Sequence, residues 1–378
     1  MDLDTRYPAI SDLRIKAQRR IPHFVFEYLD SATGIEDQKR RNEDALLSVH
    51  FHPQILQGPL DIDLTTEFLG HKYPLPFGCA PVGMSGIMWP GTEKILSASS
   101  AITGIPYCMS TVATVLPETL APFIGDQGWF QMYMPRKKTI RSDMMARAKA
   151  AGFHTLILTV DTPSESRRER QRRANLTIPP KISPAMVLSM MMHPNWTLGT
   201  LKEGIPSLKF CESYVDGSDE FHSLAHAGHI IRGQPAWNDI DEIRAEWDGP
   251  FIVKGVQRVA DAKRLVDKGV DAIWLTNHTG RQFDGGPACL DALPLIRAAL
   301  PDTPLIYDSG IQGGLDILRA IALGADFVML GRAFHYAVGA LGANGPDHLV
   351  HILKEDMLTN MAQIGVQSLS ELHNHLVR

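Results

Sequence analysis

The chain has 378 residues, of which 44% are hydrophobic and 21% charged, and its formal net charge is -5. This length fits one large barrel-type domain or two ordinary domains of a globular protein. The slightly acidic balance gives no global basic surface, so we expect no nucleic-acid partner. The first ten residues lack a signal-peptide pattern, and no apolar run is long enough to span a membrane. We therefore expect a cytoplasmic protein, and leave open peripheral contact with the inner membrane.

The chain contains four cysteines, Cys79, Cys108, Cys211 and Cys289, and no C-x-x-C pair. Cys79 and Cys108 lie in apolar, strand-like runs. This usage predicts buried thiols in a reducing compartment and not a disulfide framework.

The N-terminal part, residues 1–70, is expected to form a helical cap. Residues 8–32 begin with the helix-start signals Pro8 and Ser11 and continue with recurring apolar residues. Residues 33–70 are mixed and polar. We interpret them as a cap over the amino end of a barrel or as a strap around it.

From about residue 75, short apolar runs alternate with helical stretches. This alternation predicts a parallel sheet, and eight such units favour a closed (β/α)8 TIM barrel over residues 75–340, followed by C-terminal helices at 341–378. The whole chain, 1–378, is then a single domain. A doubly wound open sheet is the alternative, but no G-x-G-x-x-G follows the first strand, so its dinucleotide-binding version has little support. The predicted strands are 76–82, 105–109, 128–133, 155–160, 251–254, 272–276, 304–307 and 326–329.

A long insertion, residues 178–237, follows the fourth predicted strand. It includes Pro179-Pro180 and the Met-rich run SPAMVLSMMMHP, in which residues 185–192 are expected to form a short apolar helix. An insertion of this length inside a barrel usually has a function or is mobile. We interpret it as a lid or a membrane-surface patch, with ordinary packing or a subunit contact as the plain alternative.

Polar side chains recur where the predicted strands end. In a barrel these positions converge at one mouth, where catalytic groups lie. His278 and Arg281 follow the sixth strand: a proton acceptor near neutral pH and a permanent cation that grips a carboxylate. The pair suggests proton removal beside a carboxylate. His-x-x-Arg alone would favour a surface loop, and the polar residues at the other strand ends are what favour the functional interpretation. The other strand-end residues are Ser110, Gln131, Tyr133, Thr159, Asp161, Arg168, Lys254, Asp308, Gly310, Gly331 and Arg332.

The last two strand ends, YDSGIQGG and LGRAF, have the character of a phosphate site. Glycine lets the backbone approach an anion closely, and helix N-terminal amides favour negative charge. Ser110, Gln131 and Thr159 are suited to hydrogen-bond a flat heterocycle, beside which Lys254 would place a cation. Together these features predict a phosphorylated, ring-bearing cofactor.

Two other patterns are weaker. His222, His226 and His229 share a helical spacing but lack a convincing further ligand, so we predict no metal site. The basic run RRERQRR at 167–173 is interpreted as a solvated loop from which Arg168 points inward.

The combined motifs TNHTGRQFDGG, VDTPSESRRE, FIVKGV, WFQMYM, YDSGIQGG and LGRAF resemble those of the FMN-dependent L-2-hydroxy acid oxidase/dehydrogenase family, from about residue 8 to the C-terminus. The resemblance implies FMN as cofactor, a small-molecule L-2-hydroxy acid (lactate-like) oxidised to its 2-oxo acid, and a homotetramer.

The resemblance also assigns roles. His278 matches the catalytic base, Asp161 the carboxylate that holds it, Arg281 and Arg168 the substrate carboxylate clamps, and Tyr28 and Tyr133 the substrate-binding tyrosines. Lys254 matches the lysine at the flavin N1–C2 edge. The remaining matches are flavin, ribityl and phosphate contacts at Pro81, Val82, Gly83, Ser110, Gln131, Thr159, Thr276, Asp308, Gly310, Gln312, Gly331 and Arg332.

The sequence departs from the family pattern at several positions. Thr276 replaces a common Ser and keeps the hydroxyl. Thr279 stands where Gly usually follows the base, and Gln312 replaces a common Arg, which removes one charge near the flavin. Val82 and Gly83 also differ from the usual residues and reshape the space at the reactive flavin edge.

The insertion resembles those of lactate and mandelate dehydrogenases more than that of glycolate oxidase. We therefore expect electrons to pass to quinone or cytochrome, with an O2-using oxidase as the alternative. Two further readings stay open: a catalytically inactive flavin-binding protein, and a barrel enzyme whose phosphate site holds its substrate. Transfer of the electrons from the acid as a carbanion pair or as hydride also stays open.

Overall fold

The computed structural model describes residues 2–174, 184–214 and 233–377. Eight parallel strands close into a barrel, in which the last strand pairs with the first. The eight predicted strands and the predicted fold class are therefore confirmed, with boundaries that shift by a few residues. The barrel strands are β3 (Phe77–Cys79), β4 (Tyr107–Ser110), β5 (Gly128–Tyr133), β6 (Thr155–Thr159), β7 (Phe251–Lys254), β8 (Ala272–Leu275), β9 (Leu305–Tyr307) and β10 (Phe327–Leu330).

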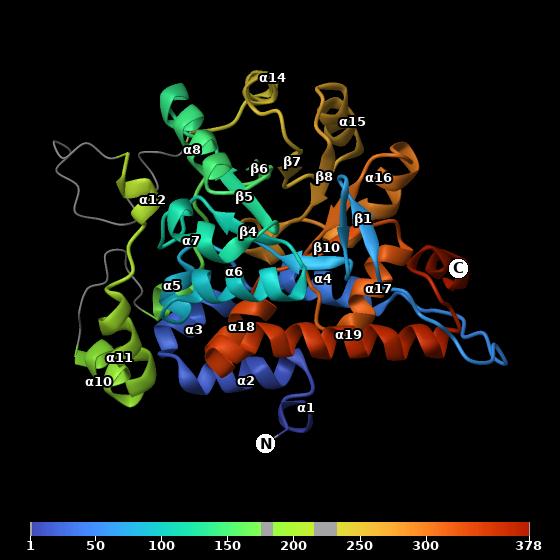
Figure 1. Ribbon diagram of the computed structural model, residues 1–378, viewed down its shortest axis with the longest axis horizontal. Coiled ribbons are helices and arrows are strands. Elements are labelled where there is room, and N and C mark those ends of the chain that lie inside the picture. The colour runs from blue at the N-terminus through green and yellow to red at the C-terminus, as the bar shows by residue number, and fades with distance from the viewer. Residues whose placement is uncertain (1, 175–183, 215–232, 378) are drawn as a thin grey trace.

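Helices surround the barrel on its outside (Figure 1). Every residue of β4, β6, β7 and β8 is buried, as expected for strands covered on both faces. The helices that follow the strands are α6 (Thr92–Thr103), α7 (Pro117–Ile124), α8 (Lys138–Ala150), α14 (Trp237–Glu246), α15 (Val259–Asp267), α16 (Leu293–Ala299), α17 (Gly314–Ala322) and α18 (Arg332–Leu341).

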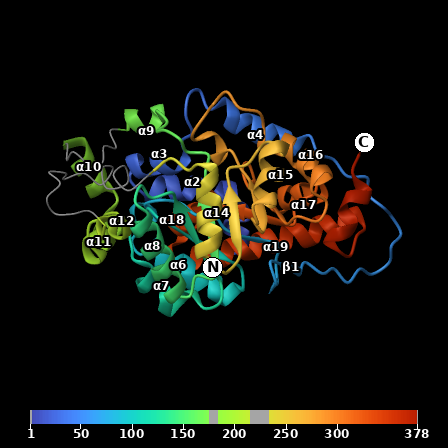
Figure 2. The ribbon, with the colours of Figure 1, turned by 90° about the horizontal axis from the view of Figure 1, so that it is seen from above.

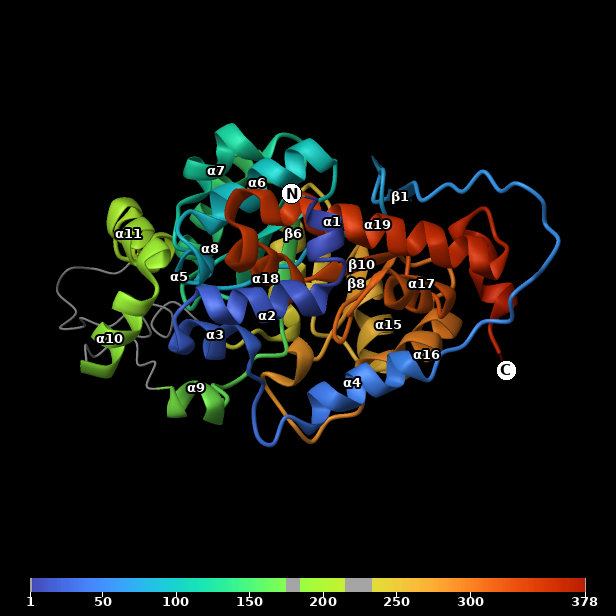
Figure 3. The same cartoon turned by 90° about the horizontal axis from the view of Figure 1, so that it is seen from below.

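The N-terminal segment forms two helices where the sequence suggested one helical stretch. Helix α2 (Ile10–Arg20) is followed by its C-cap residue, Ile21, and α3 (His23–Asp30) begins after Pro22. Pro22 has no backbone N–H to continue the first helix. Helix α2 lies against α18 (Figure 3). The contact is close because Gly339 has no side chain: a Cβ there would lie 3.2 Å from the Cβ of Ala17.

Residues 33–70 divide between the two ends of the barrel. The hairpin of β1 (Thr66–Phe68) and β2 (His71–Tyr73) places Phe68 and Tyr73 against Trp129 and Phe327 at the amino end. Helix α4 (Asp37–Leu47) instead contacts the short 3-10 helices His278–Gly280 and Cys289–Ala292 beyond β8. This second placement brings α4 to the carboxyl end of the barrel.

The described residues 184–214 of the insertion lie at one side of the barrel (Figure 2). The predicted apolar helix is confirmed as α10 (Pro184–Met192), and α11 (Pro194–Glu203) packs beside it. Trp196 anchors α11, because its Nε1 donates to the Ile87 carbonyl at 2.9 Å and its ring contacts Phe24 edge-on. The remaining elements are α1 (Leu3–Arg6), α5 (Ser85–Met88), α9 (Glu169–Arg173), α12 (Lys209–Glu212), α19 (Gly345–Ile364) and the 3-10 helices Gly342–Asn344 and Leu369–His375.

The four cysteines are all buried and free, as the sequence predicted.

Candidate active site

A cavity of about 990 Å3 lies at the carboxyl end of the barrel. Its walls come from the loops after the barrel strands, from α3 and from α4. Most of the residues singled out in the sequence line it, although they come from segments spread over some 300 positions. These are Tyr28, Pro81, Val82, Gly83, Tyr133, Arg168, Lys254, His278, Arg281, Asp308, Gly310, Gln312, Gly331 and Arg332.

Five of the singled-out residues do not line the cavity. Ser110, Gln131 and Thr159 are buried below it and bond to one another: Ser110 Oγ donates to Gln131 Oε1 at 3.1 Å, and Gln131 Nε2 donates to Thr159 Oγ1 at 2.9 Å. Thr276 is also buried, and its hydroxyl donates to Asp308. Asp161 bonds to the ring of His278 and does not itself line the cavity.

His278 is held by Asp161. Its Nδ1 lies 2.5 Å from Asp161 Oδ2, and since an ionised carboxylate only accepts, Nδ1 carries the hydrogen. Burial raises the pKa of Asp161, but its electrostatic interaction and hydrogen bond with His278, with help from Lys254, hold that pKa below the ordinary value. Nε2 is then the ring nitrogen that is free to accept a proton.

The backbone at the base is strained. His278 and Thr279 have φ angles of 52° and 51°, a left-handed conformation that non-glycine residues rarely adopt. Thr279 N–H donates to Ser309 Oγ at 3.2 Å, and Ser309 itself has a φ of 97°. Such strain clusters at functional sites, where the surrounding structure enforces it.

Lys254 ends β7 inside the barrel mouth. Its Nζ lies 3.1 Å from Asp308 Oδ2 and 4.9 Å from the centre of the Trp274 ring. Burial lowers the pKa of Lys254, but the carboxylates of Asp308 and Asp161 outweigh burial and raise it. The site therefore keeps a positive charge on this wall.

Three arginines, Arg168, Arg281 and Arg332, make another part of the cavity wall strongly cationic. Within the described residues, the hydrogen bonds of Arg281, Arg168 and Arg332 all go to neutral oxygens: Arg281 and Arg332 donate to carbonyls at the end of α3, and Arg168 donates to Ser166 Oγ. Burial, together with repulsion from Arg168 and Arg332, lowers the pKa of Arg281 to about 9. Since none of these three guanidiniums pairs with a carboxylate among the described residues, the cavity is suited to an anionic ligand.

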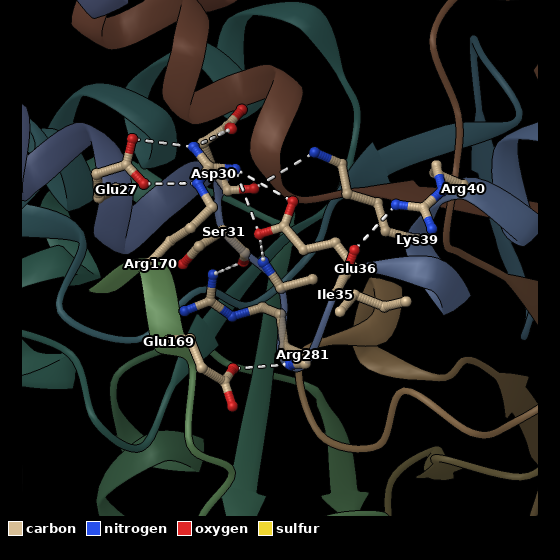
Figure 4. A network of polar contacts seen from close by, with 12 residues as sticks. Glu27, Asp30, Ser31, Ile35, Glu36, Lys39, Arg40, Glu169, Arg170 and Arg281 are labelled. Atoms are coloured by element: carbon tan, nitrogen blue, oxygen red, sulfur yellow. Dashed lines mark hydrogen bonds and ion pairs between the residues drawn. The ribbon is translucent and has the colours of Figure 1, made fainter. Parts of the chain in front are cut away.

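The last turn of α3 is fixed by a network of charged side chains (Figure 4). Arg170 binds Glu27 through two bonds of 2.7 and 2.9 Å, and reaches Asp30 at 3.0 Å and Glu36 at 3.1 Å. Asp30 also accepts from Arg14. The same turn supplies the carbonyls that hold Arg281 and Arg332.

This network corrects the interpretation of residues 167–173 as a solvated loop. They include the five-residue helix α9, in which Arg170 is engaged by three carboxylates. Sequence reasoning missed Arg170, and it also missed Lys39 of α4, which lines the cavity. The spacing of Glu27 and Asp30, one helical turn apart, was the available signal for a basic partner.

The predicted absence of a metal site is only partly covered by the structure. His222, His226 and His229 lie outside the described residues. Among the residues that the structure describes, no group of three or more His, Cys, Asp or Glu side chains is placed to hold a metal ion. None of the helices that the structure describes is long and apolar enough to cross a membrane.

The barrel and its cationic cavity define an α/β-barrel enzyme that acts on an anionic ligand. The family model of FMN-dependent dehydrogenases matches residues 17–378. An L-lactate dehydrogenase of Ectopseudomonas mendocina is 34% identical over 98% of both chains, and one of Vibrio cholerae is 35% identical over 96% of this chain and 97% of its own. The crystal structure of a monotopic membrane protein, (S)-mandelate dehydrogenase, superposes with a TM-score of 0.91 at 31% identity over 98% of this chain and 99% of its own. A mandelate oxidase structure gives 0.83 at 28% identity over 98% of each chain.

The chain belongs to the FMN-dependent dehydrogenase family and is an FMN-dependent 2-hydroxy acid oxidoreductase. The cavity fits this cofactor. Helix α18 begins at Arg332 on the cavity wall, where its first N–H groups favour a phosphate, and Lys254 supplies a cation on another wall.

Proposed function

We propose that this protein oxidises a small, lactate-like L-2-hydroxy acid to the 2-oxo acid and passes the electrons from reduced FMN to a quinone or a cytochrome. The observation that carries the proposal is the His278–Asp161 pair, which shares one cavity with Arg281 and Arg168. A proton acceptor beside two carboxylate-binding cations matches the chemistry of a 2-hydroxy acid.

In this proposal the substrate carboxylate binds to Arg281, Arg168 and Tyr28. The ring of Tyr28 lies under the Arg281 guanidinium, 5.4 Å from ring centre to Cζ, and its hydroxyl donates to the Gly83 carbonyl at 3.1 Å. Tyr28 thus ties the carboxylate clamp to the loop of residues 81–83. Tyr133, on the same cavity wall, binds the substrate hydroxyl.

Nε2 of His278 accepts the substrate proton, and Asp161 stabilises the resulting imidazolium through Nδ1. FMN, when bound, accepts the two electrons released from the acid. Lys254 contributes positive charge to the cavity and would there stabilise the negative charge of the reduced cofactor.

The test replaces the base with a neutral side chain. His278→Gln should retain FMN, but anaerobic L-lactate should no longer bleach its absorbance, with a loss of at least about 100-fold in the reduction rate. His154→Gln is a matched control, because His154 lies at the amino end of the barrel and stacks on His71. Reduction of the His278→Gln enzyme at the rate of the control would refute the role.

The same anaerobic titration identifies the substrate. The curated relatives are named L-lactate dehydrogenases, and the structural neighbours are named mandelate enzymes. We expect L-lactate to bleach the flavin faster than L-mandelate. Bleaching by L-mandelate alone would move the assignment to aromatic acids, and no bleaching by any 2-hydroxy acid would favour the inactive flavin-binding alternative.

A quinone acceptor places the reaction at a membrane surface, and the insertion offers a surface to dock there. Helices α10 and α11 expose a set of large apolar side chains: Val187, Leu188, Met191, Met192, Leu198 and Leu201. Exposed apolar patches of this kind mark interaction surfaces. The mandelate dehydrogenase neighbour is described as a monotopic membrane protein, which supports peripheral attachment here.

The membrane proposal predicts that the protein sediments with lipid vesicles. Leu188→Glu combined with Met191→Glu should abolish sedimentation, whereas Ile102→Glu on α6, whose side chain is 76% exposed, should not. Equal sedimentation of the wild type, the double variant and Ile102→Glu would remove the support for this surface.

Slow return of flavin colour in air is expected for a dehydrogenase, and rapid return would favour the oxidase alternative. The homotetramer stays a prediction.

A further inference from the structure

The cavity has one end suited to phosphate. Gly331 and Arg332 line it at the start of α18, and Gly310 and Gln312 line it from the loop after β9. The FMN phosphate monoester carries a charge between about -1.5 and -2 at neutral pH. This end of the cavity therefore has to supply more than one positive charge to neutralise it.

The loop after β9, residues 308–313, supplies no positive charge there. Gln312 is neutral, and its Nε2 donates to Glu43 Oε1 of α4 at 3.2 Å. Arg332 is a cation, and its donors reach the carbonyls of Leu29 at 3.2 Å and Ser31 at 3.1 Å. Arg332 and the helix amides therefore leave part of the phosphate charge unmatched.

Lys39 of α4 lines the same cavity. Among the described residues its Nζ reaches only the Asp30 carbonyl, at 3.5 Å, which is long for a hydrogen bond (Figure 4). The Asp30 carboxylate accepts hydrogen bonds from Arg14, Arg170 and Tyr336. No ion pair with a carboxylate is formed by Lys39 within the described part of the chain.

The electrostatic surroundings place Lys39 near Arg332. Burial is the main effect that lowers the pKa of Lys39, and the positive charge of Arg332 lowers it further, against the opposing carboxylates of Asp30, Glu43 and Glu36. Two cations that repel each other at the wall of a cavity are stabilised when an anion lies between them.

We propose that Lys39 binds the phosphate of FMN and supplies the positive charge that Gln312 does not provide. This inference rests on FMN as the cofactor and is independent of which acid is oxidised. Because the readout is binding to the cofactor-free protein, its failure leaves the proposed reaction untouched.

The experiment removes FMN from the holoenzyme and titrates the apoprotein with FMN and with riboflavin, which lacks the phosphate, following flavin fluorescence. Lys39→Met should weaken FMN binding by about 10- to 100-fold, the range for a lost hydrogen bond to a charged group. Riboflavin binding should change by less than about 2-fold, and unchanged riboflavin binding also reports that the variant has folded. An equal effect on both ligands, or on neither, would overturn the proposal.

Two further variants make the test specific. Lys39→Met combined with Gln312→Arg should recover most of the FMN affinity, because the arginine returns a cation to the same end of the cavity. Arg40→Met, the next residue of α4, whose guanidinium pairs with Asp37, should leave the FMN affinity at the wild-type value. Failure of Gln312→Arg to improve binding in the Lys39→Met background would contradict the charge exchange, as would a loss in Arg40→Met equal to that in Lys39→Met.

Discussion

Asp161 and His278 lie 117 positions apart in the chain, yet Asp161 Oδ2 lies 2.5 Å from Nδ1 of His278. Asp161 follows β6 and His278 follows β8, and β7 stands between these two strands in the barrel. The remaining oxygen, Asp161 Oδ1, is buried without a hydrogen-bond partner among the described residues. The carboxylate is therefore positioned for the histidine ring.

This geometry predicts the effect of Asp161→Asn. An amide that donates to Nδ1 would move the ring hydrogen to Nε2, so the base would present the wrong tautomer to the substrate. We expect the rate of flavin reduction to fall by about 100- to 10,000-fold while FMN stays bound. Stopped-flow reduction with L-lactate measures it, and a loss below about 3-fold would show that Asp161 does not set the tautomer.

Arg170 is expected to act on substrate binding through the residues that it positions. It braces the turn of α3 whose carbonyls hold Arg281, and it lies two residues after Arg168. Arg170→Met should raise KM for the 2-hydroxy acid by about 10-fold or more and change kcat less, since a salt-bridge network that loses one partner leaves buried charges unpaired.

Arg147→Met is the matched control. Arg147 also donates two hydrogen bonds to one carboxylate, that of Glu118, but it does not line the cavity. Arg170→Lys should recover part of the KM effect, since lysine restores the charge but not the two-pronged contact. If Arg170→Met and Arg147→Met change KM equally, Arg170 has no positioning role.

Thr279 carries a backbone conformation that glycine adopts without cost. Its φ of 51° and ψ of 43° are left-handed, and its side chain is β-branched. Thr279→Gly should raise the free energy of unfolding by about 1 kcal/mol, after allowance for the greater freedom of glycine in the unfolded chain. Urea unfolding of the FMN-saturated protein measures the change. Thr119→Gly, within α7, should do the opposite and lower the free energy of unfolding by about 0.3 kcal/mol, the difference between the helix propensities of threonine and glycine. Equal losses in the two variants would rule out strain at Thr279.

His335 makes stability depend on pH. Its Nε2 lies 2.7 Å from Ser85 Oγ and its Nδ1 lies 2.9 Å from the Gly331 carbonyl. Burial lowers the pKa of His335 from the ordinary histidine value of 6.5 to about 4. Between those two values the unfolded chain binds the proton more tightly than the folded protein. Folded-state stability should therefore decrease as pH falls from about 6.5 to about 4, with no further loss from this group at lower pH.

The contribution between pH 7 and pH 5 is about 2 kcal/mol. His335→Gln should reduce the pH dependence of the unfolding free energy by about that amount, measured by urea unfolding at both pH values with FMN saturating. His154, whose pKa burial also lowers to about 4, remains in both proteins and provides a common background. A His335→Gln variant with the same pH dependence as the wild type would contradict the expectation.

The sequence by itself determined the barrel and most of the cavity wall. Each barrel strand is a short apolar run that needs only its neighbours in sequence to be recognised, and eight alternations leave few ways to close the sheet. Residues that directly follow such runs, including Lys254, His278 and Arg281, lie at the carboxyl end for the same reason. Roles at these positions were read from motifs, and they remain proposals until the variants are measured.

Only the tertiary structure decided which side chains reach the cavity and which serve one another. Ser110, Gln131 and Thr159 end their strands as expected, but their side chains bond together below the cavity. Arg170 meets Glu27 across 143 positions, and Lys39 enters the wall because α4 crosses the carboxyl end of the barrel. Such contacts depend on how separate helices pack over the barrel mouth. No local pattern of residues encodes that packing, because it depends on the burial and charge pairing of segments that are distant in the chain.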